Sequence, residues 1–112
     1  MLPKSKRVRA SREFRKIMQM GKTFKGTALL VTWIPNKGET RLGITVTKKY
    51  ADAVERNRFK RIVREAFRLM ISSGLLPVIP NTVDCNIRPR KNGITFAECV
   101  RDLQDFFASL AK

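Results

Sequence analysis

Six cations crowd into the thirteen residues from Arg56 to Arg68, in the run RNRFKRIVREAFR. Only one acidic residue, Glu65, lies among them. Like charges at this spacing repel one another, and a fold gains nothing from that repulsion. Arginine predominates in the run, and its planar guanidinium group matches phosphate oxygens in a bidentate arrangement. The run therefore predicts contact with a polyanionic partner.

Residues that could carry out chemistry on a substrate are scarce. The chain has no histidine, which excludes histidine-based acid–base catalysis, a Ser-His-Asp triad and histidine metal ligation. The nine acidic residues are scattered, and no P-loop, GxGxxG or nucleophile-elbow motif occurs. Cys85 and Cys99 fit no metal-binding spacing, and we expect both to be buried apolar side chains. If the protein takes part in catalysis, another molecule supplies the reacting groups.

The charge of the whole chain is uneven. The 112 residues carry a net charge of +15. Residues 1–68 hold 19 Lys and Arg against 5 Asp and Glu, a balance of +14, whereas residues 69–112 hold 5 against 4, a balance of +1. This asymmetry predicts a binding surface for phosphate or for an acidic membrane. No stretch has the apolar length of a signal peptide or of a membrane-spanning helix, so we expect a cytoplasmic protein.

The cationic run lies on a predicted amphipathic helix over residues 53–72. Its apolar arc comprises Phe59, Ile62, Val63, Ala66, Leu69 and Met70, and the opposite arc comprises Asn57, Lys60, Arg61, Arg64 and Arg68. A merely solvated face would mix charge signs, because opposite charges one turn apart stabilise a helix. A helix lying on a membrane would need its apolar side for lipid, but the domain needs that side for its core. Nucleic acid remains as the partner. Structured RNA suits a rigid charged helix better than DNA does, but the sequence pattern does not exclude DNA.

The remaining patterns predict two further helices and at least three strands. A helix is predicted over 11–20 with Ser11 as its N-cap and Gly21 as its stop, and a capping box of Thr95 and Glu98 starts the last helix. Strands are predicted over 28–34, 41–47 and 82–88, with a turn at 35–38 and an optional short strand at 22–25. In the strand at 82–88, Val83, Cys85 and Ile87 are expected to point inward. The order α-β-β-α-β-α indicates an α/β (α+β) two-layer sandwich, in which a mixed sheet of three to four strands packs with three helices. We expect one RNA-binding domain over 1–112, with 1–10 as a flexible basic arm.

The predicted strand at 41–47 has one unusually small polar face. Leu42, Ile44 and Val46 point one way, and Arg41, Gly43, Thr45 and Thr47 point the other. This face is either an ordinary solvated sheet surface or a floor kept low so that a ligand can lie close.

The segment RLGITVTKKYADAVERNRFKRIVREAFR, 41–68, resembles the protein subunit of bacterial ribonuclease P. That family has a V-S/T-K-K element followed by R-N-R and K-R-x-x-R-E, which match Thr47-Lys48-Lys49, Arg56-Asn57-Arg58, Lys60-Arg61 and Arg64-Glu65 in order and spacing. SREFRKIMQMGK, 11–22, resembles its first helix, and VDCNIRPR, 83–90, resembles its last strand. The resemblance implies a catalytic RNA with bound Mg²⁺ that removes the 5′ leader of precursor tRNA. It also implies a left-handed βαβ crossover, an exception to the usual handedness.

The resemblance also implies two sets of binding residues and no catalytic or metal-binding residue in the protein. The residues implied to bind the catalytic RNA are Arg56, Asn57, Arg58, Lys60, Arg61, Arg64 and Arg68. The residues implied to line the cleft for the precursor tRNA leader are Phe14, Met18, Thr32, Thr45, Thr47, Lys48 and Lys49. Met18 and Thr32 stand where relatives often carry aromatic residues, so stacking on the leader is expected to be weaker or to rely on Phe14 alone. Trp33 should face away from this cleft.

Two other functions are compatible with the charge pattern. One is a small ribosomal-type protein that clamps structured rRNA, and the other is a metal-dependent nuclease that acts alone. The scattered acids argue against the nuclease. No membrane and no small-molecule substrate are expected as partners.

Overall fold

The computed structural model describes residues 7–8, 10–38, 40–72 and 82–110. Its elements are α1 (Ser11–Met20), β1 (Lys22–Lys25), β2 (Leu29–Asn36), β3 (Arg41–Ile44), α2 (Ala53–Ser72), β4 (Thr82–Pro89) and α3 (Phe96–Leu110). The four strands form one mixed sheet in the order β1-β2-β4-β3, in which β3 and β4 are parallel and the other neighbours are antiparallel. The predicted fold class is confirmed, and the optional strand at 22–25 is the outer strand β1.

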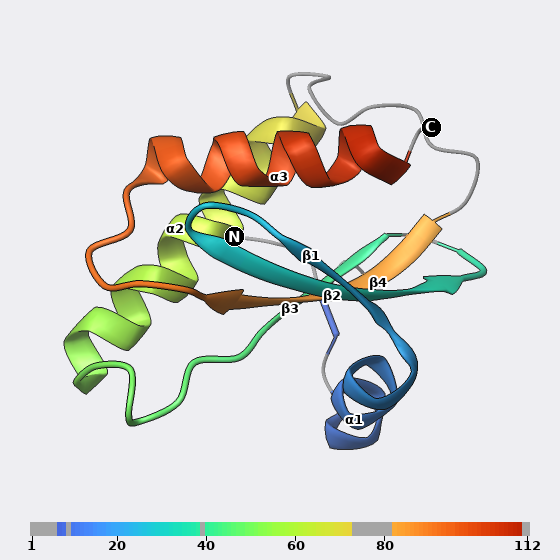
Figure 1. Ribbon diagram of the computed structural model, residues 1–112, viewed down its shortest axis with the longest axis horizontal. Coiled ribbons are helices and arrows are strands. Elements are labelled where there is room, and N and C mark those ends of the chain that lie inside the picture. The colour runs from blue at the N-terminus through green and yellow to red at the C-terminus, as the bar shows by residue number, and fades with distance from the viewer. Residues whose placement is uncertain (1–6, 9, 39, 73–81, 111–112) are drawn as a thin grey trace.

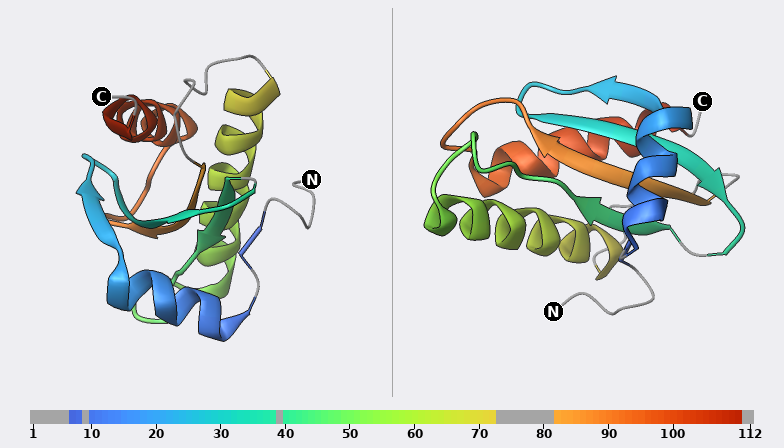
Figure 2. Two further views of the ribbon diagram at one scale, coloured as in Figure 1. Left: turned by 90° about the vertical axis from the view of Figure 1, so that its right-hand side faces the viewer. Right: turned by 90° about the horizontal axis from the view of Figure 1, so that it is seen from below.

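The helices divide between the two faces of the sheet. Helices α2 and α3 lie on one side, and α1 lies across the other (Figure 1). Strand β3 leads through α2, along the sheet edge, into its parallel neighbour β4. With α2 on the side of α3, this crossover is left-handed, as the family resemblance implies (Figure 2).

The space between the sheet and helices α2 and α3 is filled by the hydrophobic core. Val31 of β2 and Cys85 and Ile87 of β4 point into it and are fully buried. Phe106 lies among other aromatic rings, and its ring contacts those of Phe24, Trp33 and Phe107. Trp33 therefore faces the core and not α1, as predicted.

Helix α2 has the predicted bounds, but its buried arc is rotated from the predicted one. Phe67, which the sequence pattern left out of the apolar arc, is fully buried, and its ring centroid lies 6.0 Å from that of Phe107. Leu69, which was predicted to be buried, is 39% exposed. The rotation has a simple cause: the main packing partner of α2 is α3, which reaches the arc that carries Phe67.

Helix α3 is fixed at its start and in its middle. The predicted capping box is confirmed, because Glu98 N–H donates to Thr95 Oγ1 at 3.2 Å and Thr95 N–H donates to Glu98 Oε1 at 3.0 Å. Further along, the buried carboxylate of Asp102 accepts hydrogen bonds from the backbone N–H groups of Ala28 at 2.7 Å and Leu29 at 2.9 Å. These bonds tie α3 to the beginning of β2.

Some predicted boundaries were wrong. The N-cap of α1 is Ala10 and not Ser11, and the Ala10 N–H donates to Glu13 Oε1 at 3.2 Å. Strand β3 ends at Ile44 and not at residue 47. The last sheet bond in this segment runs from Thr45 N–H to the Ile87 carbonyl at 3.0 Å, and the chain then turns between residues 47 and 50. The predicted turn at 35–38 begins later, since residues 35–36 still pair with β4.

The basic N-terminal segment is described only at residues 7, 8 and 10. There it lies beside the sheet. Arg7 forms a parallel bridge with Leu42, and Val8 N–H donates to the Leu42 carbonyl at 2.9 Å. Val8 is 6% exposed. Arg7 and Val8 thus pair with β3, and Ala10 caps α1, whereas residues 1–6 and 9 of the expected arm lie outside the described part of the chain.

Candidate nucleic-acid interface

The cations of α2 fall into two groups by their partners. Arg58 pairs with Glu55 at 3.6 Å, and Arg68 pairs with Glu65 at 2.7 Å. The described part of the chain offers no ion-pair partner to Arg56, Lys60, Arg61 and Arg64. A surface that served solubility alone would pair or mix these charges. The unpaired group therefore agrees with the prediction of a polyanionic partner.

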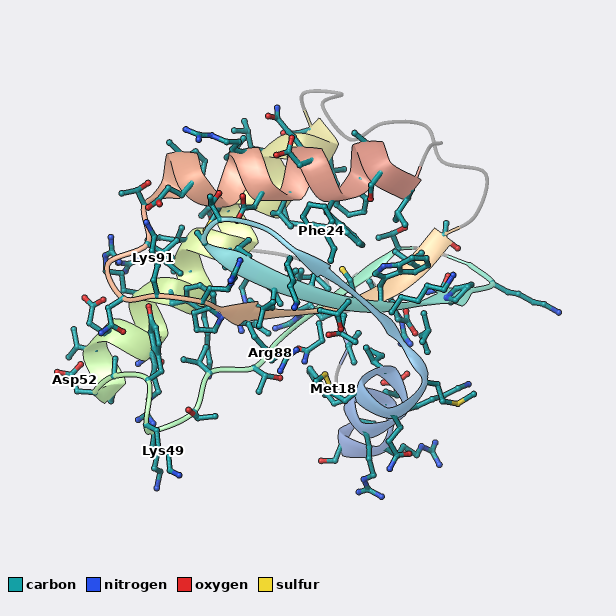
Figure 3. The ribbon with its side chains drawn as sticks, in the orientation of Figure 1. Met18, Phe24, Lys49, Asp52, Arg88 and Lys91 are labelled. Atoms are coloured by element: carbon teal, nitrogen blue, oxygen red, sulfur yellow. The ribbon has the colours of Figure 1, made fainter. Side chains whose placement is uncertain are left out.

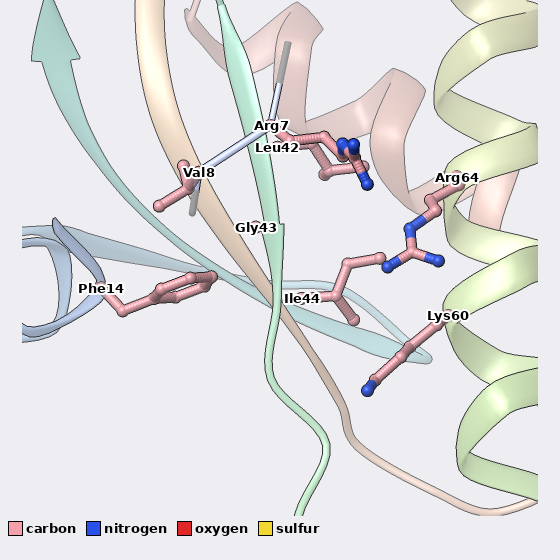
Figure 4. Close-up of a pocket in the computed structure, with 8 residues that line it drawn as sticks. All are labelled: Arg7, Val8, Phe14, Leu42, Gly43, Ile44, Lys60 and Arg64. Atoms are coloured by element: carbon pink, nitrogen blue, oxygen red, sulfur yellow. The ribbon is translucent and has the colours of Figure 1, made fainter. Parts of the chain in front are cut away.

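The unpaired cations also differ in exposure. Arg61 is exposed, like its neighbour Asn57, whereas Lys60 and Arg64 are half-buried. Lys60 and Arg64 line a hollow between α2 and β3, together with Arg7 (Figure 4). We call this the Arg7 hollow.

Phe14 of α1 forms the far wall of the Arg7 hollow and packs on Gly43 of β3. A Cβ atom at position 43 would lie 2.5 Å from Phe14 Cε1, so only glycine lets the ring lie this close. A low floor for a ligand was one of two interpretations of this strand face, and at Gly43 the space is occupied by a side chain of the protein itself. Phe14 lies across β3 from Lys60 and Arg64 but lines the same hollow, although these two residues were predicted for a different surface (Figure 4).

The two predicted threonines line another hollow further along the sheet. Thr45 and Thr47 lie there with Tyr50 and Arg88, and Leu30 and Pro89 add apolar walls. Thr45 Oγ1 donates to Asn86 Oδ1 at 3.0 Å. Burial raises the pKa of the Tyr50 hydroxyl, and this group is a hydrogen-bond donor at neutral pH. We call this the threonine hollow.

The remaining predicted cleft residues differ in exposure. Lys48 and Lys49 are exposed in the turn after the threonines, and Lys49 extends from it into solvent (Figure 3). Met18 is 41% exposed and its sulfur accepts a hydrogen bond from Asn86 Nδ2 at 3.3 Å. Thr32 is only 1% exposed, so it lies beneath the surface. A ligand above Thr32 would meet Arg88 first, because Arg88 Nη2 donates to Thr32 Oγ1 at 3.3 Å.

An ionic clamp joins α1 to the sheet. The guanidinium of Arg41 in β3 binds Asp84 of β4 through Nε at 2.8 Å and Nη2 at 2.7 Å. The same Nη2 donates to Glu13 Oε2 of α1 at 2.7 Å. The hydrogen bond to Asp84, and to a lesser extent the one to Glu13, raises the pKa of Arg41, and the guanidinium is charged. The clamp sets the position of α1 over the polar face.

No three His, Cys, Asp or Glu side chains of the described residues gather where they could hold a metal ion. Within the same residues, no helix is long and apolar enough to cross a bilayer. Both cysteines are fully buried, as predicted, and burial raises the pKa of each thiol to about 12. Thiols of this kind stay protonated at neutral pH and are poor nucleophiles.

Comparison with known proteins decides between the functions that the charge pattern left open. A family model described as Ribonuclease P matches residues 2–111. The chain belongs to the ribonuclease P protein family. It is similar to the ribonuclease P protein component of Finegoldia magna, with 40% identity over 91 residues that cover 81% of this chain and 76% of the relative. It is also 37% identical to that of Chlamydia trachomatis serovar L2 over 95 residues, which cover 81% of this chain and 72% of the relative.

Solved structures of ribonuclease P proteins share the fold. The RNase P protein from Thermotoga maritima matches with a TM-score of 0.76 at 30% identity, covering 95% of this chain and 98% of that one. The Staphylococcus aureus RNase P protein matches with a TM-score of 0.76 at 24% identity, covering 97% and 100%, which shows the fold alone. Members of the ribonuclease P family are accessory protein subunits of a tRNA-processing endoribonuclease, and the ribosomal-type alternative is not supported.

Sequence reasoning missed two cations, Arg88 and Arg7, that the structure brings to this surface of the ribonuclease P protein. Arg88 alternates with Val83, Cys85 and Ile87, which were predicted to point inward, so its outward direction could have been read from the strand pattern. Arg7 could not have been found, because its place depends on pairing with a strand 35 residues away in the sequence.

Proposed function

We propose that this chain binds ribonuclease P RNA through the cations of α2 and holds the 5′ leader of precursor tRNA on the polar sheet face beside α1. The observation that carries the proposal is the set of unpaired cations on α2, which lies next to a concave polar surface. Arginine side chains can bind phosphate bidentately, and structured RNA offers phosphates at fixed positions. The expected partners are the catalytic RNA and precursor tRNA, and the expected compartment is the cytoplasm.

The two surfaces have different tasks in this proposal. Arg56, Asn57, Arg58, Lys60, Arg61, Arg64 and Arg68 are assigned to the catalytic RNA. Phe14, Met18, Thr45, Thr47, Lys48 and Lys49 are assigned to the leader, with Thr32 supporting Arg88 from below. Thr45 and Thr47 offer hydroxyl groups, and Lys48 and Lys49 offer positive charge for a backbone that passes the turn. Phe14 is a less accessible stacking platform than the sequence implied, since its ring rests on Gly43.

The chemistry of cleavage is assigned to the RNA. Mg²⁺ bound by that RNA would supply the metal-ion chemistry of cleavage, and the described residues of the chain do not form a metal site of their own. The task of the protein is to bind and orient the two RNA molecules. Such positioning lowers the entropic cost of bringing reactants together.

Reconstitution tests the proposal as a whole. The full chain is combined with a bacterial ribonuclease P RNA and a precursor tRNA at near-physiological Mg²⁺. We expect 5′ maturation that depends on both RNA and protein. Cleavage by the protein without RNA would instead revive the nuclease that acts alone.

A charge placed in the threonine hollow tests the leader assignment. Thr45→Glu or Thr47→Glu puts a carboxylate where leader phosphates are expected to pass, at a cost of about 1–3 kcal/mol in a partly desolvated groove. Affinity for precursor tRNA should fall, while affinity for mature tRNA should stay close to wild type. Ala108→Glu, which adds the same charge on the exposed surface of α3, is the control. Equal losses for both tRNA forms would contradict the leader assignment and leave general RNA binding standing.

A further inference from the structure

The Arg7 hollow gathers three cations from two separate segments. Arg7 comes from the N-terminal segment beside β3, and Lys60 and Arg64 come from successive turns of α2. Figure 4 shows all three side chains projecting into the space between β3 and α2. None of the described residues that line the hollow is acidic. Cations that converge without a counter-charge raise each other's energy, and an anion between them removes that cost.

Arg7 is held in place by its backbone and not by its side chain. The bridge to Leu42, together with the hydrogen bond from Val8 N–H to the Leu42 carbonyl, fixes the segment against the sheet. The Arg7 Nε atom is buried and has no hydrogen-bond partner among the described residues. A buried donor without an acceptor is unfavourable, so the site lacks an acceptor that a ligand could provide.

The shape and lining of the hollow favour a compact anion. Leu42 and Ile44 form an apolar floor, and Phe14 closes one wall. An apolar surrounding strengthens charge-assisted hydrogen bonds because water screens them less. Two guanidinium groups can each present a fork to tetrahedral oxygens, and the lysine adds a point charge.

We propose that the Arg7 hollow binds one phosphate group of an RNA backbone. Arg7 and Arg64 donate hydrogen bonds to its non-bridging oxygens, and Lys60 neutralises its charge. The inference rests on the proposed RNA-binding function and adds a discrete site with a residue, Arg7, that lies outside α2. The site differs from the exposed surface around Arg61, where a phosphate would remain in water.

Titration of the full-length protein with inorganic phosphate tests the hollow without RNA. The readout is the NMR signal of the Arg7 Nε–H group, which should shift on saturation because it gains an acceptor. The same titration is made with Arg7→Gln, Arg64→Gln and a control, Arg101→Gln, which removes one charge from the exposed side of α3. We expect phosphate affinity to fall about 10- to 100-fold in the first two, as for the loss of charge-assisted hydrogen bonds, and less than about twofold in the control.

Two results of this titration would overturn the proposal. One is equal phosphate affinity in Arg7→Gln, Arg64→Gln and Arg101→Gln, which would mean diffuse attraction to a basic protein. The other is an Arg7 Nε–H signal that does not move at saturation in the wild-type chain. This second measurement needs no variant, so it decides the matter even where Arg7→Gln fails to fold.

Binding to RNA distinguishes an RNA phosphate from free phosphate as the natural ligand. Affinity for ribonuclease P RNA and for precursor tRNA in the assembled particle is measured across a salt series. Arg7→Gln and Arg64→Gln should each flatten the log–log salt dependence by about 0.7–0.9 for one RNA, as for one lost phosphate contact. The RNA assignment would be overturned if Arg7→Gln and Arg64→Gln lost phosphate binding but kept the RNA affinities and salt slopes of Arg101→Gln. A wild-type chain that binds neither RNA would refute the proposed function itself, while the phosphate titration would still report on the hollow.

Discussion

The two faces of the sheet are built by opposite means. Successive residues of β4 are buried on opposite faces of the sheet. Cys85 and Ile87 lie in the core, and Asp84 and Asn86 lie under α1. On the core face, burial removes apolar surface from water. On the α1 face, buried groups are satisfied by hydrogen bonds and by the ionic clamp. The difference indicates that most of the stability comes from one face, whereas the other carries the polar groups that we propose to bind RNA.

Helix α1 shows how lightly the polar face is covered. Ile17 is its one fully buried side chain among the described residues, whereas α3 buries Cys99, Asp102, Leu103, Phe106 and Phe107. A helix with so small an apolar contact depends on directional bonds for its position. Arg41 and its two carboxylate partners provide them.

The largest effect should come from the core face. Phe107→Ala removes a fully buried ring that contacts both Phe67 and Phe106. We expect the free energy of unfolding to fall by about 3–5 kcal/mol, measured by chemical denaturation. RNA affinity measured while the variant is still folded should change little. A loss of RNA affinity in the folded variant would break the division of tasks between the two faces.

The next largest effect should come from the clamp. Arg41→Met leaves Asp84, whose side chain is 9% exposed, without its cation, and it releases Glu13 of α1. We expect a loss of about 1–3 kcal/mol in unfolding free energy, as for a buried charged group that loses its partner. The assembled particle should also discriminate less between precursor and mature tRNA, because α1 borders the proposed leader surface.

Arg41→Lys is the matched variant for the clamp. It keeps the charge but loses the bidentate fork, so stability and tRNA discrimination should recover only in part. Full discrimination in Arg41→Met would show that apolar contacts alone hold α1 in place.

The contrast between the faces also explains what the sequence could predict. Helix bounds, strand alternation on β4 and the inward direction of Trp33 follow from local periodicity, and these predictions are confirmed. The crowding of cations on α2 needed no structure either, because charge is a property of composition. The family resemblance added the crossover, which no local pattern encodes.

Features that depend on contacts distant in the sequence could not be predicted. Phe67 is buried because α3 lies beside α2, and Gly43 is required because Phe14 packs on it. Lys60 and Arg64 share an arc with Arg61 on a helical projection, yet they turn toward β3 and Arg7. A projection places residues around a helix axis but says nothing of which neighbouring segment stands beside each arc.

The cysteines should have a smaller effect, confined to stability. Cys85→Ala and Cys99→Ala should each lower the unfolding free energy by about 1–2 kcal/mol, because both side chains are fully buried. Burial raises the pKa of both thiols to about 12, so neither is a thiolate at neutral pH. Maturation of precursor tRNA by the reconstituted particle should persist in both variants, with or without reductant. Loss of activity on adding a zinc-selective chelator would contradict this assignment.

The smallest effect should come from a surface pair on the α3 side, and it should depend on pH. Lys91 and the Thr95 N–H lower the pKa of Glu98 from 4.5 to about 2. A lowered carboxyl pKa stabilises the folded state above the unfolded pKa, and this contribution is lost as the pH falls from about 4.5 to about 2. Glu98→Gln should therefore be slightly less stable than wild type at neutral pH, and the two curves should converge near pH 2. Lys91→Met should reproduce part of this loss, and the double variant should lose less than the sum of the two, as for a directly coupled pair. Parallel curves of unfolding free energy against pH for wild type and Glu98→Gln would show that solvent screening cancels the interaction of this pair. The apolar contacts of α3 would then hold it on the core face without help from surface charge.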